Sequence, residues 1–192
     1  MPAFIRKKQK NIVYWRVAFL ERQAPVKAIY SSRAGGLSLL PYTGLNLGLH
    51  VGDDPARVIA NRRLLAEALN LPLENWVIGQ QVHGDKIALV ERRHAGCGSV
   101  NSDTVLKGVD AMITAEPGVT LAAFYADCVP IYIVDPVKRS LGLVHAGWKG
   151  TVLGIGGRVV ARMAKEFNSC PADLLAAIGP AIGPRCYQVD SK

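Results

Sequence analysis

Short apolar runs separated by turn residues dominate the chain after its first third. The segments 108–114, 129–136 and 141–147 are rich in Val, Ile, Leu and Ala, and turn-forming or charged residues separate them. Runs of this length and composition are typical of buried β-strands. The segments in which we predict strands are 12–21, 26–32, 75–84, 85–91, 108–114, 119–128, 129–136, 141–147 and 174–178.

Helical periodicity is clearest over residues 54–70. Val58 and Leu65 fall on one face of such a helix. Asp54 is a good N-cap, because its carboxylate can accept a hydrogen bond from the first turn, and Pro55 suits the first helical position. The pattern therefore predicts a helix that begins at Asp54 and ends near residue 70.

A second helix is predicted over residues 151–167. Its apolar residues recur at near-helical spacing, and they are Val152, Ile155, Val159, Met163 and Phe167. Because strands outnumber helices, we expect an α/β fold in which a mixed β-sheet core is layered with helices. A length of 192 residues suits one substantial core, so residues 1–192 are expected to form a single domain.

Two segments show neither the pattern of a strand nor that of a helix. Residues 33–55 contain five glycines and two prolines, and they are predicted to form a long ordered loop. Residues 92–102 are predicted to form a shorter polar loop. Because long loops in compact domains are usually functional, the first of the two is a candidate part of a binding site.

Composition and charge exclude several classes of protein. Apolar residues make up 49% of the chain and charged residues 20%, as in ordinary globular proteins. No apolar run approaches the roughly 20 residues of a membrane span, and the N-terminus lacks a signal sequence, so a cytoplasmic protein is expected. Part of the net charge of +8 lies in the basic run of residues 6–10, which is interpreted first as a solvated chain end, and a general preference for anionic partners is the alternative. No basic run is interleaved with aromatic residues, so nucleic acid is not expected.

The residues best suited to chemistry are two of the four histidines and one of the four cysteines. His83, Cys128 and His145 each lie at the predicted end of a strand and are followed within two residues by Gly or Pro. Strand ends present side chains to a shared crevice. Two His and one Cys suit a zinc ion that keeps its fourth position for water or substrate, which is the arrangement of a catalytic zinc site.

The sequence leaves other roles open for these residues. Cys128 could act as a nucleophile without a metal, with His145 as its base and Asp127 as the orienting carboxylate. This role requires a thiolate, and hence a neighbouring imidazolium. The three residues could also form a structural zinc site or an inert core. A structural zinc needs a fourth protein ligand, for which no residue has convincing context.

Two Gly-rich segments each contain a cationic residue. Arg33 lies beside Gly35 and Gly36, and Lys149 lies beside Trp148 just before the second predicted helix. A cation and bare backbone amides near a helix N-terminus suit a phosphate group. Neither segment is a Walker A motif or a dinucleotide fingerprint. Phosphate binding by Arg33 and Lys149 is therefore a hypothesis.

Six motifs in a fixed order resemble one known family. They are GLNLGLHVGDDP, NRRLL, QQVHG, ADCVP, HAGWKGT and IGPAIGP. The matches run from about residue 31 to residue 187, and several ordered motifs are far more specific than one. The chain is similar to the laccase-domain family, once described as multicopper polyphenol oxidoreductases and now as YfiH-type purine nucleoside phosphorylases.

The resemblance implies a cytoplasmic α/β enzyme that binds zinc through residues matching His83, Cys128 and His145. It implies phosphorolysis of adenosine, inosine, guanosine and methylthioadenosine, and hydrolytic deamination of adenosine. Arg33 and Asn46 match pocket positions of the family. The expected partners are purine nucleosides and phosphate, with no nucleic acid and no membrane, and the expected state is a monomer or a homodimer.

Deamination and copper chemistry add two further expectations. The signature of the known zinc nucleobase deaminases is absent, so Asp127, next to Cys128, is the candidate proton shuttle. Copper is the alternative metal, and a laccase-like polyphenol oxidase is the alternative function. A multicopper oxidase binds several copper ions mainly through imidazoles, and four histidines are too few. A single copper at the same three residues stays open.

The chain departs from the family pattern at two places. Lys149 stands where many relatives have Arg, which keeps the charge but loses the bidentate fork toward phosphate. Relatives also continue through a further segment that ends in an aromatic, Arg-rich motif. We therefore expect this chain to lack the C-terminal segment seen in relatives.

Overall fold

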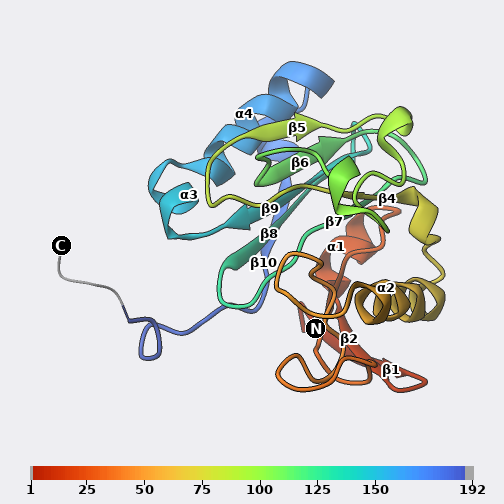
Figure 1. Cartoon of the computed structure of the whole chain (residues 1–192). Coiled ribbons are helices and arrows are strands. Elements are labelled where there is room, and N and C mark those ends of the chain that lie inside the picture. Colours follow the sequence, from red (N-terminus) through yellow and green to blue (C-terminus); the bar gives the residue numbers. More distant parts are fainter. Residues whose placement is uncertain (1, 189–192) are drawn as a thin grey trace.

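Three β-sheets and four α-helices make up the computed structural model, which describes residues 2–188 (Figure 1). The largest sheet has five strands in the order β10-β8-β9-β6-β5. These strands are β5 Ile87–Leu89, β6 Ala111–Thr114, β8 Val129–Asp135, β9 Ser140–Ala146 and β10 Leu175–Ile178. β5 and β6 are parallel, and the other neighbouring pairs are antiparallel. This mixed sheet with helices packed on it confirms the predicted α/β fold.

Side chains alternate between the two faces of the large sheet, as the pleat of a strand requires. On one face, Ile133 and Val144 pack against Val159 and Met163 of helix α4, Ile155–Phe167, and all four are nearly fully buried. Figure 1 shows α4 lying along this face. Burial of these apolar side chains is the main contribution that holds α4 to the sheet.

The opposite face of the large sheet is covered by the N-terminal part of the chain. Tyr132 and Leu143 point to this side and pack with Val17 and with Leu20 of helix α1, Ala18–Gln23. The Tyr132 hydroxyl donates a hydrogen bond of 2.9 Å to the carbonyl of Ile29. This packing joins the N-terminal sheet to the large one.

In the N-terminal part of the chain, a helix follows β2, Ile12–Arg16, where a longer strand was expected. In the antiparallel N-terminal sheet, β2 lies between β1 Ile5–Gln9 and β3 Ile29–Ser31. The prediction of a strand over 12–21 is wrong in its second half, because α1 begins at Ala18. Residues 18–23 are mostly good helix formers, and the helix places Leu20 on the large sheet.

The third sheet contains two short parallel strands, β4 Trp76–Ile78 and β7 Thr120–Ala122. The predicted strand over 119–128 is therefore much too long, and the segment 75–84, predicted as a strand that leads into a turn, is a strand only over Trp76–Ile78. The backbone N–H of Phe124 donates to Oε1 of Gln81 at 2.9 Å, and Nε2 of Gln81 donates to the carbonyl of Phe124 at 2.7 Å. These side-chain bonds replace the strand pairing that the longer elements would have made.

Helix α2, Pro55–Leu69, agrees with its prediction. The Asp54 carboxylate accepts a hydrogen bond of 2.9 Å from the N–H of Ala56, and Asn70 ends the helix in the left-handed conformation. The second predicted helix is interrupted. It consists of α3, Trp148–Val152, and α4, because Gly154 adopts φ +72° between them.

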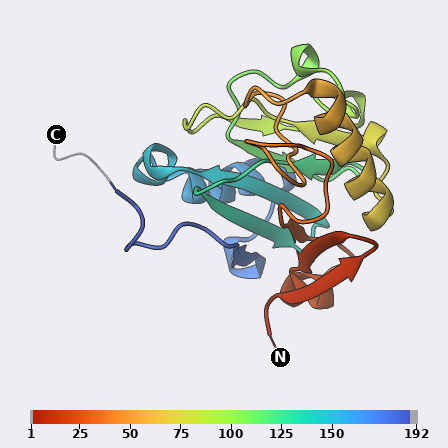
Figure 2. The same ribbon diagram turned by 60° about the horizontal axis from the view of Figure 1, so that its bottom comes forward.

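Residues 33–55 form a loop, as predicted, and Figures 1 and 2 show it (orange) beside α2. The fully buried side chain of Asn61 donates to Ser38 and to the carbonyl of Asn46, and it accepts a bond from the N–H of Leu37. The remaining short helical segments are 3₁₀ turns: Leu73–Asn75, Arg92–His94, Ser102–Thr104 and Pro171–Asp173. Among the described residues, no helix is both long and apolar enough to cross a bilayer.

Candidate metal centre

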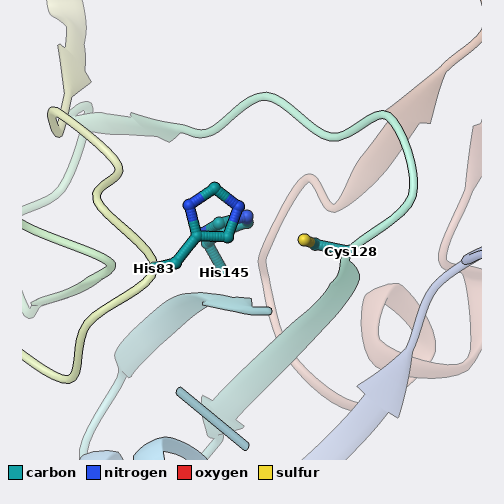
Figure 3. Close-up of side chains that lie close together, drawn as sticks. All are labelled: His83, Cys128 and His145. Carbon is teal, nitrogen blue, oxygen red and sulfur yellow. The ribbon is translucent and has the colours of Figure 1, made fainter. Parts of the chain in front are cut away.

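His83, Cys128 and His145 come together in the structure (Figure 3). Each offers one ligand atom, and these atoms all lie within 4.8 Å of one another. The two imidazole rings meet edge to face with their centroids 4.9 Å apart. Figure 3 shows the Cys128 sulfur pointing toward the rings. The three residues are separated by up to 62 positions in sequence, so the fold alone assembles them.

The strand pairing explains how the three side chains meet. Cys128 directly precedes β8, and His145 is the last residue but one of β9. Because β8 and β9 are antiparallel and Pro130 is paired with His145, the start of one strand lies beside the end of the other. Cys128 therefore lies just before a strand, and the expectation that it ends one is wrong. His83 arrives from the loop that follows β4.

Gly147 makes the close approach of the ligands sterically feasible. A Cβ atom on this residue would lie 2.8 Å from Cδ2 of His83 and 3.3 Å from the sulfur of Cys128. The first distance is shorter than carbon atoms tolerate. Any side chain at position 147 would therefore push His83 away from Cys128.

A buried carboxylate lies directly behind the two histidines. Asp110, just before β6, has a fully buried side chain, and its Oδ1 lies 2.8 Å from Nδ1 of His145. The same carboxylate accepts bonds from three consecutive backbone N–H groups, those of Val82, His83 and Gly84, at 2.8–3.2 Å. Consecutive amides that converge on one anion form a nest.

Burial and hydrogen bonding act against each other at this carboxylate. Burial favours the neutral form of Asp110, but the bonds from His145 and the nest lower its pKa below the ordinary value. Burial lowers the pKa of His145, although the bond to Asp110 acts in the opposite direction. His145 is therefore disposed to be neutral, which is the form that binds a metal.

The thiol of Cys128 lies in an environment that disfavours its charge. Burial raises its pKa, and the negative charges of Asp127 and Asp110 raise it further. A cysteine nucleophile in a metal-free enzyme needs the opposite shift. A bound cation would compensate for this shift, because coordination deprotonates a thiol.

The donor set fits zinc in number and type. A sulfur and two imidazole nitrogens around one tetrahedral zinc lie roughly 3.5 Å apart, given metal–ligand distances of about 2.0–2.3 Å. The observed spread of up to 4.8 Å leaves a small contraction to complete the site. His145 is buried, Cys128 is half-buried and His83 is exposed, so one side of the cluster faces solvent.

A large cavity of about 1520 Å³ lies beside the cluster, between the N-terminal sheet and the large sheet. The three candidate ligands do not line it, but the loop leading to Cys128 does, through Phe124, Tyr125 and Ala126. The ring of Tyr125 has its centroid 5.7 Å from that of His145, and its hydroxyl donates to the carbonyl of Val144. Tyr125 therefore lies on the cavity wall and next to the candidate metal centre.

Arg33 and Asn46 lie on the wall of this cavity. Arg33 is exposed and donates Nε and Nη2 to the carbonyl of Thr43, which leaves Nη1 as its remaining nitrogen. The Asn46 amide donates to Asp53 and accepts from the N–H of Gly48. Both ends of the Asn46 side chain thus hold the loop in shape.

Lys149 and Asp127 do not line the cavity. Lys149 is exposed, and its ammonium group lies 5.5 Å from the ring centroid of the exposed Trp148. Asp127 is exposed beside Cys128, and its carbonyl accepts a bond from Ile182. The structure therefore does not bring Arg33 and Lys149 onto one common surface of the cavity.

Reasoning from sequence missed the residues that hold the ligands in place. These are Asp110, Gln81 and Gly147. Asp110 had one usable signal, since it is the single charged residue in the apolar segment 108–114. Gln81 and Gly147 lie within the QQVHG and HAGWKGT motifs, but the motifs alone do not show what these two residues contact.

Comparison with known proteins defines the class to which this fold and cluster belong. Residues 27–192 match the family described as multi-copper polyphenol oxidoreductase laccase, so the chain belongs to this family. The resemblance read from the six motifs is thereby confirmed.

Individual relatives carry a different description. The chain is 49% identical over 162 residues to "Purine nucleoside phosphorylase YlmD" of Geobacillus stearothermophilus, a match that covers 84% of this chain and 59% of that protein. The protein of the same name from Bacillus subtilis is 42% identical over 167 residues, covering 87% and 60%. This chain thus spans about three fifths of the length of these relatives.

Solved structures show the same fold. YlmD from Geobacillus stearothermophilus superposes with a TM-score of 0.92 at 44% identity, over 99% of this chain and 69% of that chain. The hypothetical protein YfiH from Bacillus licheniformis gives 0.91 at 39% identity, with the same coverage of both chains.

Proposed function

We propose that this chain is a zinc-dependent purine nucleoside phosphorylase whose metal ligands are His83, Cys128 and His145. The observation that carries the proposal is the convergence of these three donors, with one side of the cluster facing solvent. The names of the YlmD relatives support the reaction class. When bound, zinc supplies Lewis-acid polarisation of an oxygen atom.

Phosphorolysis requires that inorganic phosphate attack C1′ of the ribose while the bond to the purine breaks. Arg33, on the cavity wall, and Lys149, outside it, are each proposed to attract the phosphate, because both are exposed cations on Gly-rich segments. Asn46 is proposed to contact the nucleoside from the cavity wall. Tyr30, Phe124 and Tyr125 line the same cavity and offer flat apolar surface to a purine ring.

Adenosine deamination is proposed as a second activity. Asp127 lies close enough to the Cys128 thiol to raise its pKa, and it is exposed. In this position its carboxylate would take a proton from the attacking water and deliver it to the departing amine.

The test measures zinc content and nucleoside turnover in the same preparations. We expect about one zinc per chain in the wild type, and loss of both zinc and activity in His83→Ala and Cys128→Ala. Cys170→Ala is the matched control, because Cys170 is a free, exposed cysteine outside the cluster. Full activity in metal-free protein would overturn the zinc proposal and favour the cysteine nucleophile.

The roles of the two cations are tested by comparing the two activities. Arg33→Ala and Lys149→Ala are expected to raise the KM for phosphate by roughly tenfold or more, while deamination of adenosine changes little. Turnover of inosine over a range of phosphate concentrations gives the KM for phosphate, and ammonia release from adenosine gives the rate of deamination. Equal loss of both activities would contradict phosphate binding by these residues.

A further inference from the structure

The buried carboxylate of Asp110 contacts both segments that carry the candidate histidine ligands. Oδ1 lies 2.8 Å from Nδ1 of His145 and 2.9 Å from the backbone nitrogen of His83. We propose that Asp110 is a positioning residue, which fixes the orientation of both histidines and thereby sets the metal affinity of the site. This inference rests on the metal site of the proposed function, but it concerns a residue with no assigned role.

The bond to His145 selects the nitrogen that remains for a metal. An ionised carboxylate only accepts hydrogen bonds, so Nδ1 of His145 must carry the proton. The lone pair is then on Nε2, the nitrogen that Asp110 does not occupy. The backbone adds to this restraint, because the N–H of His145 donates to the carbonyl of Asp110 at 2.7 Å. Residue 145 is thus held at both its ring and its main chain.

The nest fixes the second ligand through its backbone. His83 adopts φ +61°, a left-handed conformation that residues other than glycine rarely adopt. The amides of residues 82–84 can converge on Asp110 only when the chain turns in this way. The carboxylate therefore compensates for an unfavourable backbone conformation, and that conformation directs the His83 ring toward Cys128.

A second buried aspartate, Asp135, serves as a control for the loss of a buried carboxylate that does not contact the candidate ligands. Asp135, at the far end of β8 from Cys128, is also fully buried and accepts bonds from two backbone N–H groups, those of Val137 and Lys138. It contacts none of the three candidate ligands. Replacing either Asp by Asn removes a buried charge from a turn, but only Asp110 holds ligands.

The first experiment measures zinc affinity of the whole chain by competition with a chromophoric chelator. Asp110→Asn is expected to weaken zinc binding by roughly 10- to 100-fold and to change the visible absorption spectrum of the cobalt-substituted protein. Asp135→Asn is expected to stay within about threefold of the wild type. The proposal is overturned if Asp110→Asn also stays within that range, or if both variants lose the same affinity.

The second experiment uses only the wild type, so it decides the matter if Asp110→Asn does not fold. Nitrogen-15 NMR of the metal-free protein reports which ring nitrogen of His145 carries the proton. We expect Nδ1–H, and an Nε2–H tautomer would overturn the inference. A wild-type chain that binds neither zinc nor cobalt would refute the metal site itself. Zinc binding that is indifferent to Asp110→Asn would refute only the positioning role.

Discussion

At the scale of single residues, the candidate metal centre depends on a glycine, Gly147, as much as on the ligands. Gly147 has ordinary backbone angles, φ −68° and ψ 170°, so its conformation does not require glycine. Its position requires glycine, since a Cβ would collide with His83 and touch Cys128. Residue identity at this position is therefore set by the geometry of the cluster.

Gly147→Ala is expected to lower zinc affinity at least tenfold while the protein stays folded, because the added methyl group displaces the His83 ring. The measurement is zinc affinity by chelator competition, alongside thermal denaturation. Gly157→Ala is the control, since a Cβ there meets nothing within 4 Å and alanine favours the helix. Unchanged zinc binding in Gly147→Ala would contradict the steric account.

Asp53 makes the stability of the 33–55 loop depend on pH. Bonds from Ser38 and Asn46 lower its pKa below the ordinary value of 3.8. Its contribution is therefore complete above the unfolded-state pKa and is lost as pH falls through the folded-state pKa. We expect the stability difference between wild type and Asp53→Asn to be constant between about pH 7 and pH 5 and to shrink below about pH 4. Denaturant unfolding across this range measures the difference, and a difference that grows on acidification would be the wrong sign.

The candidate site shows which residue-level predictions a sequence allows. His83, Cys128 and His145 could be singled out because few residue types bind metals and each stands next to a turn. Asp110 could not be assigned a partner, because its bonds go to backbone groups of residues 82–84 that only the fold brings near. Sequence patterns thus identify the candidate metal ligands, whereas the groups that orient these ligands are determined by tertiary contacts.

At the scale of elements, helix α2 organises the loops around it through two polar residues. Its apolar residues and its caps were predictable from periodicity, but Asn61 and Arg62 are also buried. Arg62 donates to the carbonyls of Leu47, Gly98 and Ser99 at 2.7–2.8 Å. The loops of residues 33–55 and 92–102 are thus both held by one helix, which periodicity alone does not reveal.

Arg62→Leu is expected to lower the free energy of unfolding by on the order of 3 kcal/mol, because two buried carbonyls and one part-buried carbonyl lose their donor. The neighbouring Arg63 is exposed, so Arg63→Leu should change stability by less than about 0.5 kcal/mol. Urea unfolding with a common m-value compares the two variants. Equal losses of unfolding free energy in the two variants would contradict a stabilising role for the hydrogen bonds of Arg62.

The boundaries of elements were the weakest part of the predicted fold. The strands β6, β8 and β9 were found because their apolar runs are mostly buried, and β10 was found as a short apolar run at the edge of the sheet. The predicted strands 12–21 and 119–128 failed where tertiary contacts override local preference. In the first, Leu20 packs on the large sheet from a helix, and in the second, Gln81 takes over the bonds of the Phe124 backbone.

At the scale of the whole molecule, the candidate metal centre joins two sheets. Cys128 and His145 belong to the β8–β9 pair of the large sheet, while His83 follows β4 of the two-stranded sheet. Asp110, just before β6 of the large sheet, already connects these parts by its hydrogen bond from Gly84. A metal held by all three ligands would add a further connection that exists only in the folded state.

Zinc is therefore expected to stabilise the whole chain against unfolding. A ligand that binds only the native state adds about 2.7 kcal/mol when its concentration is 100 times Kd, so the melting temperature should rise with zinc and fall with a chelator. His83→Ala should lose this response, because it removes the ligand contributed by the smaller sheet. His94→Ala is the control, since His94 is outside the cluster and bonds to the N–H of Glu91. If zinc raised the melting temperature of His83→Ala as much as that of the wild type, the metal would be bound elsewhere, and the three donors would not act as one site.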